Sequence, residues 1–213
     1  MAKENVRMRI WRLMEEKGIA TFPKPIFHRI PNFIGAEKAA QKLRELPEYK
    51  AAKVIFCNPD SPQRPVREIA LKDEKTVVMA TPRLKKGFLV LDPKTIPKNR
   101  IFGASTIHGA FKHGRSIEPS RVKIDLFVAG SVAVSLDGGR LGKGRGYSDQ
   151  EYAILKSAES LSRKTIVVTT VHDIQIIEEI PKDEWDVPVD VIITPSKIMR
   201  IEKNNTDISL SNR

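Results

Sequence analysis

The sequence predicts an α/β protein whose sheet strands run mainly parallel. Short apolar runs recur along the chain, and each is bounded by chain-breaking residues, as buried strands are. Helical segments separate several of these runs, which favours crossover connections and therefore parallel pairing. With 40% hydrophobic and 30% charged residues in a chain of 213, the composition is that of an ordinary globular protein. Neither a linker nor an internal repeat is evident, so one domain is expected over residues 1–203, followed by a frayed tail over 204–213.

The N-terminal quarter is predicted to hold two helices joined by an irregular connection. Apolar residues recur at helical spacing over residues 3–17, and Gly18 closes that helix. Trp11 is expected to pack inside the protein. "TFPKPIFHRIPN" has three prolines in 12 residues, which predicts an ordered but irregular segment. A second helix, "GAEKAAQKLRELPEY", is expected to end near Pro47.

Five buried strands are predicted after the second helix, from "AAKVIFC", "KTVVMATP", "KIDLFVAGSVAV", "KTIVVTTVH" and "PVDVIITP". Two of them end beside residues that could bind a ligand. Arg83 follows Thr81-Pro82 and could hold a carboxylate or a phosphate. His172 stands beside Asp173 at another strand end, where α/β proteins commonly place ligand-binding residues. A satisfied strand-end histidine is an equally good interpretation of His172.

The net charge of +11 is concentrated in the first 150 residues, which hold 29 Lys and Arg against 15 Asp and Glu. Such a basic body suggests an anionic partner, namely a nucleotide, a polycarboxylate or a nucleic acid. A solvated basic surface without a partner is the open alternative. The chain has no apolar run long enough to span a membrane and no secretory signal, and its one cysteine, Cys57, cannot form an internal disulfide. A cytoplasmic protein without a membrane partner is expected.

The most informative stretch is "RLGKGRGYSDQEYAIL", residues 140–155, in which glycines and cations alternate before a helix. The alternating residues are Gly142, Lys143, Gly144, Arg145 and Gly146. Glycines let the backbone approach a ligand closely, and the free N–H groups of a helix start favour an anion. The pattern matches neither the Walker motif nor the dinucleotide fingerprint. It is nevertheless well suited to a phosphate chain, while a glycine-rich hairpin with solvated cations remains the alternative.

The helix after this loop is expected to begin at about Ser148, because Ser148 and Glu151 fit the S-x-x-E capping box. Asp149 then lies in the first turn. A carboxylate there would repel a bound phosphate unless a divalent cation joined them, and Mg²⁺ does so with one or two carboxylates. The loop and helix start together predict a Mg-nucleotide site.

The loop resembles the Gly-Tyr-Tyr-Asp signature of the 5-formyltetrahydrofolate cyclo-ligase (methenyltetrahydrofolate synthetase) family. The flanking segments "SIEPSRVKIDLFVAGSVAVSLDGG", "TVVMATPRLKKG" and "HDIQIIEEIPKDEWDVPVDVIITP" are also similar to that family, over about residues 75–195. "FPKPIFHRIPNFIGAEKAA", "GSVAVS" and "VVTTVHD" look like its methenyltetrahydrofolate synthetase domain-containing branch. This extends the similarity to nearly the whole chain.

The resemblance implies a three-layer, Rossmann-like sandwich and the ATP- and Mg²⁺-dependent closure of 5-formyltetrahydrofolate to 5,10-methenyltetrahydrofolate. It also implies roles for individual residues. Lys143 and Arg145 would be catalytic, and Asp149 and Asp186 would hold the metal. Arg83 and His172 are the candidates for the folate substrate. The nucleotide would be bound by the loop itself with Tyr147, and by a lysine and an arginine of the first helix, for which Lys3 and Arg7 are the nearest candidates.

The sequence departs from the family pattern mainly on the folate side. Ser148 replaces the second tyrosine of the signature, and Trp185, expected to be a packing residue, replaces the histidine of a His-Asp pair. The acidic residue that the family has after the first strand has no clear counterpart, and Asn58-Pro59-Asp60 stands in that neighbourhood. Two alternatives therefore stay open, a related ATP-using enzyme with another small substrate and a non-catalytic RNA-binding protein. Animal members of the branch carry an RNA-recognition module that this sequence does not resemble. His108 and His113, with no cysteine or third histidine nearby, make a poor metal site.

Overall fold

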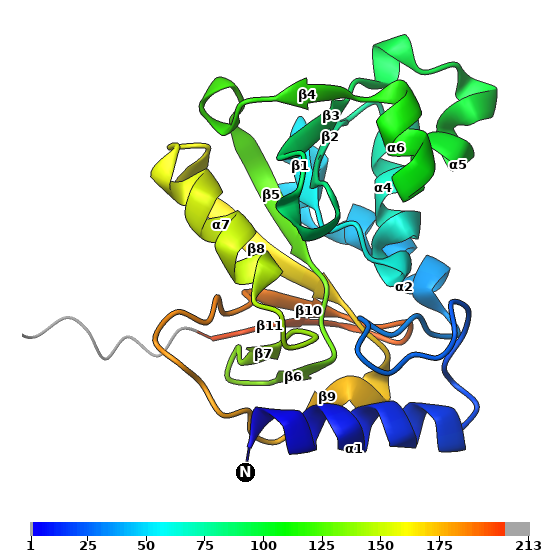
Figure 1. Cartoon of the computed structure of the whole chain (residues 1–213), viewed down its shortest axis with the longest axis vertical. Helices are drawn as coiled ribbons and strands as arrows, with labels where there is room; N and C mark the ends of the chain where they lie inside the picture. The colour runs from blue at the N-terminus through cyan, green and yellow to red at the C-terminus, as the bar shows by residue number, and fades with distance from the viewer. Residues whose placement is uncertain (1, 203–213) are drawn as a thin grey trace, which may run out of the picture.

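A computed structural model of the chain describes residues 2–202, and its centre is a large sheet of eight strands (Figure 1). The five inner strands β10, β8, β5, β1 and β2 run parallel. At one edge β11 pairs antiparallel with β10; at the other, β3 pairs antiparallel with β2, and β4 antiparallel with β3. The predicted mainly parallel sheet is confirmed. In spatial order its strands are β11 (Ile198–Arg200), β10 (Val191–Ile193), β8 (Leu161–Thr170), β5 (Ile124–Ala129), β1 (Val54–Cys57), β2 (Thr76–Ala80), β3 (Phe88–Leu91) and β4 (Arg115–Ile117).

The inner strands are almost continuously apolar because helices cover both faces of the sheet. On one face Phe56 and Phe127 stack at 4.4 Å between ring centroids, and Leu155 of α7 packs in the same cluster. On the other face Ile55 and Leu126 pack with residues of α2, α4, α5 and α6. These layers make the predicted three-layer α/β arrangement. The helices are α1 (Lys3–Glu16), α2 (Ala36–Lys42), α3 (Pro47–Ala51), α4 (Arg64–Lys72), α5 (Ile101–Ala104), α6 (Ile107–His113) and α7 (Tyr147–Ser157).

A second sheet of three short strands lies below the large one in Figure 1, with α1 packed against it. Its strands are β7 (Arg140–Leu141), β6 (Ala133–Ser135) and β9 (Ile176–Ile177). The helix predicted over residues 3–17 is confirmed, and so is the packing role of Trp11, which is fully buried and donates its indole N–H to Arg29 O at 3.0 Å. Because β7 leads into the glycine loop, this small sheet holds α1 next to that loop.

Two local expectations are wrong, the capping box and the packing of Trp185. Helix α7 begins at Tyr147, and its N-cap is Gly146 in the left-handed conformation (φ 65°), with no side-chain cap. The predicted Ser148–Glu151 capping box is therefore absent. Trp185 is 72% exposed rather than packed. Strands β3 and β4 were not among the predicted strands. The predicted frayed tail, residues 204–213, lies outside the described residues. Across residues 2–202, no helix has the length and apolarity needed to cross a bilayer.

Candidate functional site

A cleft of about 670 Å³ opens where the parallel strands end, and the glycine loop forms one of its walls. Asn58 directly follows β1 and Gly130 follows β5, so the cleft lies at the carboxyl edge of the sheet, where α/β proteins bind ligands. The wall from the loop and α7 consists of Gly142, Lys143, Arg145, Gly146, Tyr147, Ser148, Asp149 and Glu151. The other lining residues include His28, Arg29, Asn58, Asp60, Arg83 and Ile107. The predicted loop residues other than Gly144 thus share one cleft with Arg83.

The glycine loop connects β7 to α7 and is supported from below by the first helix. Arg7 donates from Nε to Gly142 O at 2.8 Å. Gly144 has φ 91°, and a Cβ at this position would lie 3.2 Å from the Arg7 guanidinium carbon. Glycine is therefore required at Gly144 by both conformation and space. Arg7, predicted to lie near the phosphates, does contact the loop, although it is not part of the cleft wall.

The two cations of the loop have different surroundings. Lys143 Nζ pairs with Asp60 Oδ1 at 2.7 Å. Arg145 is exposed and has no hydrogen-bond or ion-pair partner within residues 2–202. Arg83 is also exposed, in the left-handed conformation (φ 59°) just after β2. Within residues 2–202, Arg145 and Arg83 are thus cations of the cleft whose side chains have no hydrogen-bond or ion-pair partner and are free to bind an anion.

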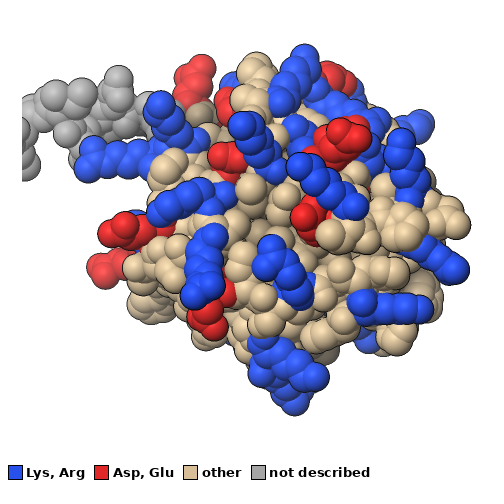
Figure 2. All heavy atoms as spheres, turned by 90° about the horizontal axis from the view of Figure 1, so that it is seen from above, with Lys and Arg blue, Asp and Glu red and all other residues tan. Residues whose placement is uncertain are grey.

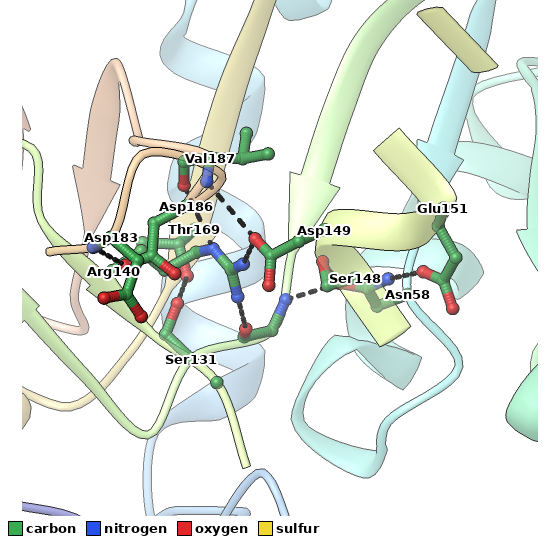
Figure 3. Close-up of polar contacts among 12 residues, drawn as sticks. Asn58, Ser131, Arg140, Ser148, Asp149, Glu151, Thr169, Asp183, Asp186 and Val187 are labelled. Atoms are coloured by element: carbon green, nitrogen blue, oxygen red, sulfur yellow. Dashed lines mark hydrogen bonds and ion pairs between the residues drawn. The ribbon is translucent and has the colours of Figure 1, made fainter. Parts of the chain in front are cut away.

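Arg140, at the start of the loop, is buried and joins several parts of the site (Figure 3). Its guanidinium forms an ion pair with Asp149 and donates to Gly130 O at 3.2 Å and Val187 O at 3.3 Å. The same Asp149 oxygen accepts the Val187 N–H at 3.2 Å. Sequence reasoning missed Arg140; the available signal was a charged side chain placed between a glycine turn and the apolar Leu141.

The two predicted metal ligands each bind a cation of the protein through one oxygen. Asp186 Oδ2 accepts from Lys3 Nζ at 2.5 Å and from the Asp183 N–H at 2.7 Å. The second oxygen of Asp149 and that of Asp186 have no partner within residues 2–202. Mg²⁺ binds through one or two carboxylates and completes its shell with water and phosphate oxygens. The donor set therefore fits this metal, although the described chain contains no cluster of three or more acidic, His or Cys side chains.

A buried carboxyl group faces the cleft on the α7 side, and the sequence did not reveal it. Glu151 is 3% exposed and accepts from Asn58 Nδ2, while Asn58 Oδ1 accepts from the Gly130 N–H at 2.8 Å and from Ser148 Oγ at 3.0 Å (Figure 3). Burial, with the nearby charge of Asp60, raises the pKa of Glu151 to about 8. Within residues 2–202, Glu151 Oε1 has no hydrogen-bond partner. Ser148 and Glu151, the two side chains of the predicted capping box, therefore line the cleft instead.

His172 does not line the cleft. The ring atom Nδ1 of His172 accepts the Ile174 N–H at 3.2 Å, and the backbone N–H of His172 donates to Gln175 Oε1 at 2.7 Å. His172 therefore caps the short 3-10 helix η7 (Asp173–Gln175). Burial lowers the pKa of His172. Of the two interpretations offered by the sequence, the structure displays the satisfied strand-end histidine.

Comparison with known proteins gives one consistent result. The sequence model of the 5-formyltetrahydrofolate cyclo-ligase family matches residues 1–195. Methenyltetrahydrofolate synthase domain-containing proteins from cattle and mouse are 40% and 41% identical over 205 residues, which is 93% of this chain and 54% and 55% of theirs. The chain thus spans about half the length of these relatives. The 5,10-methenyltetrahydrofolate synthetase structures from Aquifex aeolicus (TM-score 0.59, 23% identity, covering 100% of this chain and 97% of that one) and Mycoplasma pneumoniae (0.56, 20%, 91% and 98%) share the fold.

Proposed function

Because the chain belongs to the 5-formyltetrahydrofolate cyclo-ligase family, we propose that it closes 5-formyltetrahydrofolate, or a related formylated pterin, to the 5,10-methenyl form with ATP and Mg²⁺. One observation carries the proposal. The glycine loop presents the unpaired Arg145 to the same cleft that holds the buried Glu151. A single cleft therefore offers a phosphate-binding wall and a wall of hydrogen-bonding groups, as a reaction between a nucleotide and a second small molecule requires.

On the phosphate wall, the protein stabilises charge during phosphoryl transfer. The formyl oxygen attacks the γ-phosphorus and ADP leaves; N10 then attacks the activated carbon, and the C–O bond breaks as phosphate departs. Arg145 can donate two parallel hydrogen bonds to phosphate oxygens, and Lys143 adds a point charge. Such donors accelerate the reaction because their attraction grows as charge develops on the transferred group. When bound, Mg²⁺ held by Asp149 and Asp186 would neutralise phosphate charge.

Where α7 meets the end of β1, the protein orients the second substrate. Glu151 of α7 and Asn58 at the end of β1 form a buried polar surface, and Glu151 Oε1 has no partner within residues 2–202. In its ionised form, above a pKa of about 8, Glu151 can accept an N–H through this oxygen. A pterin ring presents ring and amino N–H groups along one edge. We propose that this wall accepts them, in place of the acidic residue that the family has after the first strand. Arg83, exposed at the cleft edge, is placed to hold a carboxylate of the same substrate.

The decisive experiment is to mix the purified protein with 5-formyltetrahydrofolate and Mg-ATP and to follow the absorbance of 5,10-methenyltetrahydrofolate. We expect an increase that requires both ATP and Mg²⁺ and is lost in Arg145→Ala. If Mg-ATP stabilises the protein but no methenyl product forms, the chain is an ATP-using enzyme with another small substrate. If Mg-ATP has no effect on stability either, the non-catalytic alternative is favoured.

A further inference from the structure

Residues 82–123 form the most basic part of the surface, and the proposed reaction leaves most of it unused. This segment holds ten Lys and Arg and only two acidic residues. All ten basic side chains are exposed, and within residues 2–202 none of them takes part in an ion pair. Elsewhere in the molecule many exposed cations are paired with carboxylates. The excess positive charge here is therefore local and uncompensated.

Exposed phenylalanines lie among these cations on the helices α5 and α6. Phe102 is 59% exposed and Phe111 is 42% exposed. The Arg64 guanidinium carbon lies 4.5 Å from the centre of the Phe102 ring, and Lys86 Nζ lies 5.6 Å from that of Phe111. Exposed aromatic rings interleaved with cations are the combination with which proteins bind single-stranded nucleic acid.

A groove of about 320 Å³ runs across this pair of helices. A Cβ at Gly109 would lie 1.8 Å from Gly103 O, so the two helices are in close contact and form a firm base. The groove also contains the two histidines that make a poor metal site. Its lining residues are Asn99, Arg100, Phe102, Gly103, Thr106, His108, Gly109, Lys112 and His113.

Figure 2 looks down on the end of the molecule that is uppermost in Figure 1, where α5, α6 and β4 lie. Lys and Arg are spread over most of this face and outnumber the acidic side chains that lie among them. The face meets the cleft at Arg83 and Ile107, which line the cleft and belong to the same basic segment. It is nevertheless separate from the glycine loop.

We propose that the α5–α6 face binds single-stranded nucleic acid. Arg100 and Lys112 bind phosphates, and bases stack on Phe102 and Phe111. Positive grooves with interleaved aromatic rings recognise single strands in this way, because every base offers a flat face and every nucleotide a charge. An acidic peptide would satisfy the charge but leave the rings unused. Helices of four and seven residues are too short to lie on a membrane as amphipathic anchors.

The test is the fluorescence anisotropy of a labelled 20-nucleotide uridine oligomer, titrated with the protein at several salt concentrations. The variant Arg100→Glu with Lys112→Glu should bind at least tenfold more weakly. The slope of log affinity against log salt should become shallower by about 0.7 for each phosphate that the variant no longer binds. Lys17→Glu with Lys38→Glu changes the net charge equally at exposed positions elsewhere and serves as the matched control.

Variants of the two phenylalanines distinguish binding of nucleic acid from binding of any polyanion. Phe102→Leu and Phe111→Leu keep apolar volume but remove the ring, so each should weaken oligomer binding by about tenfold. Neither should affect binding of poly-L-glutamate of equal charge. The proposal is overturned if the oligomer does not bind at low salt, if the control pair loses as much affinity as the groove pair, or if poly-L-glutamate competes equally and the leucine variants bind normally.

Discussion

Among single side chains, Arg140 has the greatest influence on the geometry of the site. It is buried beneath the loop, and its charge is balanced by Asp149, which is itself only partly exposed. When one partner of a buried ion pair is removed, the other charge stays desolvated and uncompensated, which is costly. Asp149 therefore has a structural role in addition to the proposed one in binding Mg²⁺.

Asp149→Asn should lower the free energy of unfolding by about 3 kcal/mol, because the Arg140 guanidinium loses its countercharge. Urea unfolding in the absence of nucleotide measures this. The matched control is Asp186→Asn, whose partner Lys3 is partly exposed and also contacts Asp183, so it should cost about 1 kcal/mol or less. Equal losses in the two variants would mean that the Arg140 pair contributes no more than a surface pair.

Glu151→Gln should raise the KM for the formylated pterin about tenfold and leave the KM for ATP unchanged. Above pH 8, where the Glu151 carboxyl is ionised, the amide keeps an acceptor for Asn58 but turns an N–H₂ group toward the substrate, so donors of the ring lose their partner. Steady-state kinetics with each substrate varied in turn measure both constants. Glu159→Gln, an exposed carboxyl just past the end of the same helix, is the control. A rise in the KM for ATP alone would mean that Glu151 contacts the nucleotide and not the pterin, which would contradict the proposal.

At the level of loops and helices, the glycine loop is expected to serve turnover more than folding. Arg145→Ala should reduce turnover about a hundredfold, as the loss of one charge-stabilising donor does. Its free energy of unfolding should change by about 0.5 kcal/mol or less, because Arg145 is exposed and unpaired within the described chain. Lys143→Ala should cost up to about 1 kcal/mol more, since it leaves Asp60 without its partner. Activity and urea unfolding, measured on each variant and on Lys156→Ala as a control, separate the two effects.

The cap of η7 should make stability depend on pH. Burial lowers the pKa of His172, although the neighbouring Asp173 opposes this, so the unfolded chain binds the proton more tightly than the folded one. The stabilisation is present above about pH 6.5 and falls as the pH drops toward the folded-state pKa. His172→Asn can cap without titrating. Its stability relative to the native chain should therefore improve between pH 7.5 and pH 5, as measured by urea unfolding. A difference that does not change with pH would contradict the cap.

The sequence predicted these elements unevenly, for physical reasons. Strands β1, β2, β5, β8 and β10 were predicted because inner strands are apolar on both faces and bounded by breakers. Strand β4 is a largely exposed Arg-Ser-Ile run without an apolar pattern, whereas β3 is a buried apolar run, Phe88–Leu91, that the prediction overlooked. The start of α7 was predicted to within one residue, but its cap was not, because a left-handed glycine, Gly146, acts as the cap where the local pattern favoured Ser148. The hydrogen bond between Asn58 and Glu151 joins residues 93 apart in the chain, and no local pattern reveals it.

For the molecule as a whole, Mg-ATP is expected to stabilise the fold. A ligand present at a hundred times its dissociation constant adds about 2.7 kcal/mol to the free energy of unfolding. A thermal scan with and without millimolar Mg-ATP measures the shift, and ATP with a chelator is the control. Tryptophan fluorescence provides a second signal. Trp185 is exposed and next to Asp186, so its emission should respond to the ligand, whereas Trp11 is buried and should not respond. No thermal shift and no change in Trp185 fluorescence would count against a nucleotide site.

The Arg140–Asp149 ion pair closes the glycine segment into a small ring, because the two residues are only nine positions apart and pair across its base. Arg7 crosses this ring on its underside. The conformational entropy of five flexible residues is therefore largely lost during folding, before any ligand arrives. A glycine-rich segment, whose composition suggests mobility, can thus be preorganised for binding. Little further conformational entropy is lost when phosphate binds, so the affinity for phosphate is not reduced by that cost.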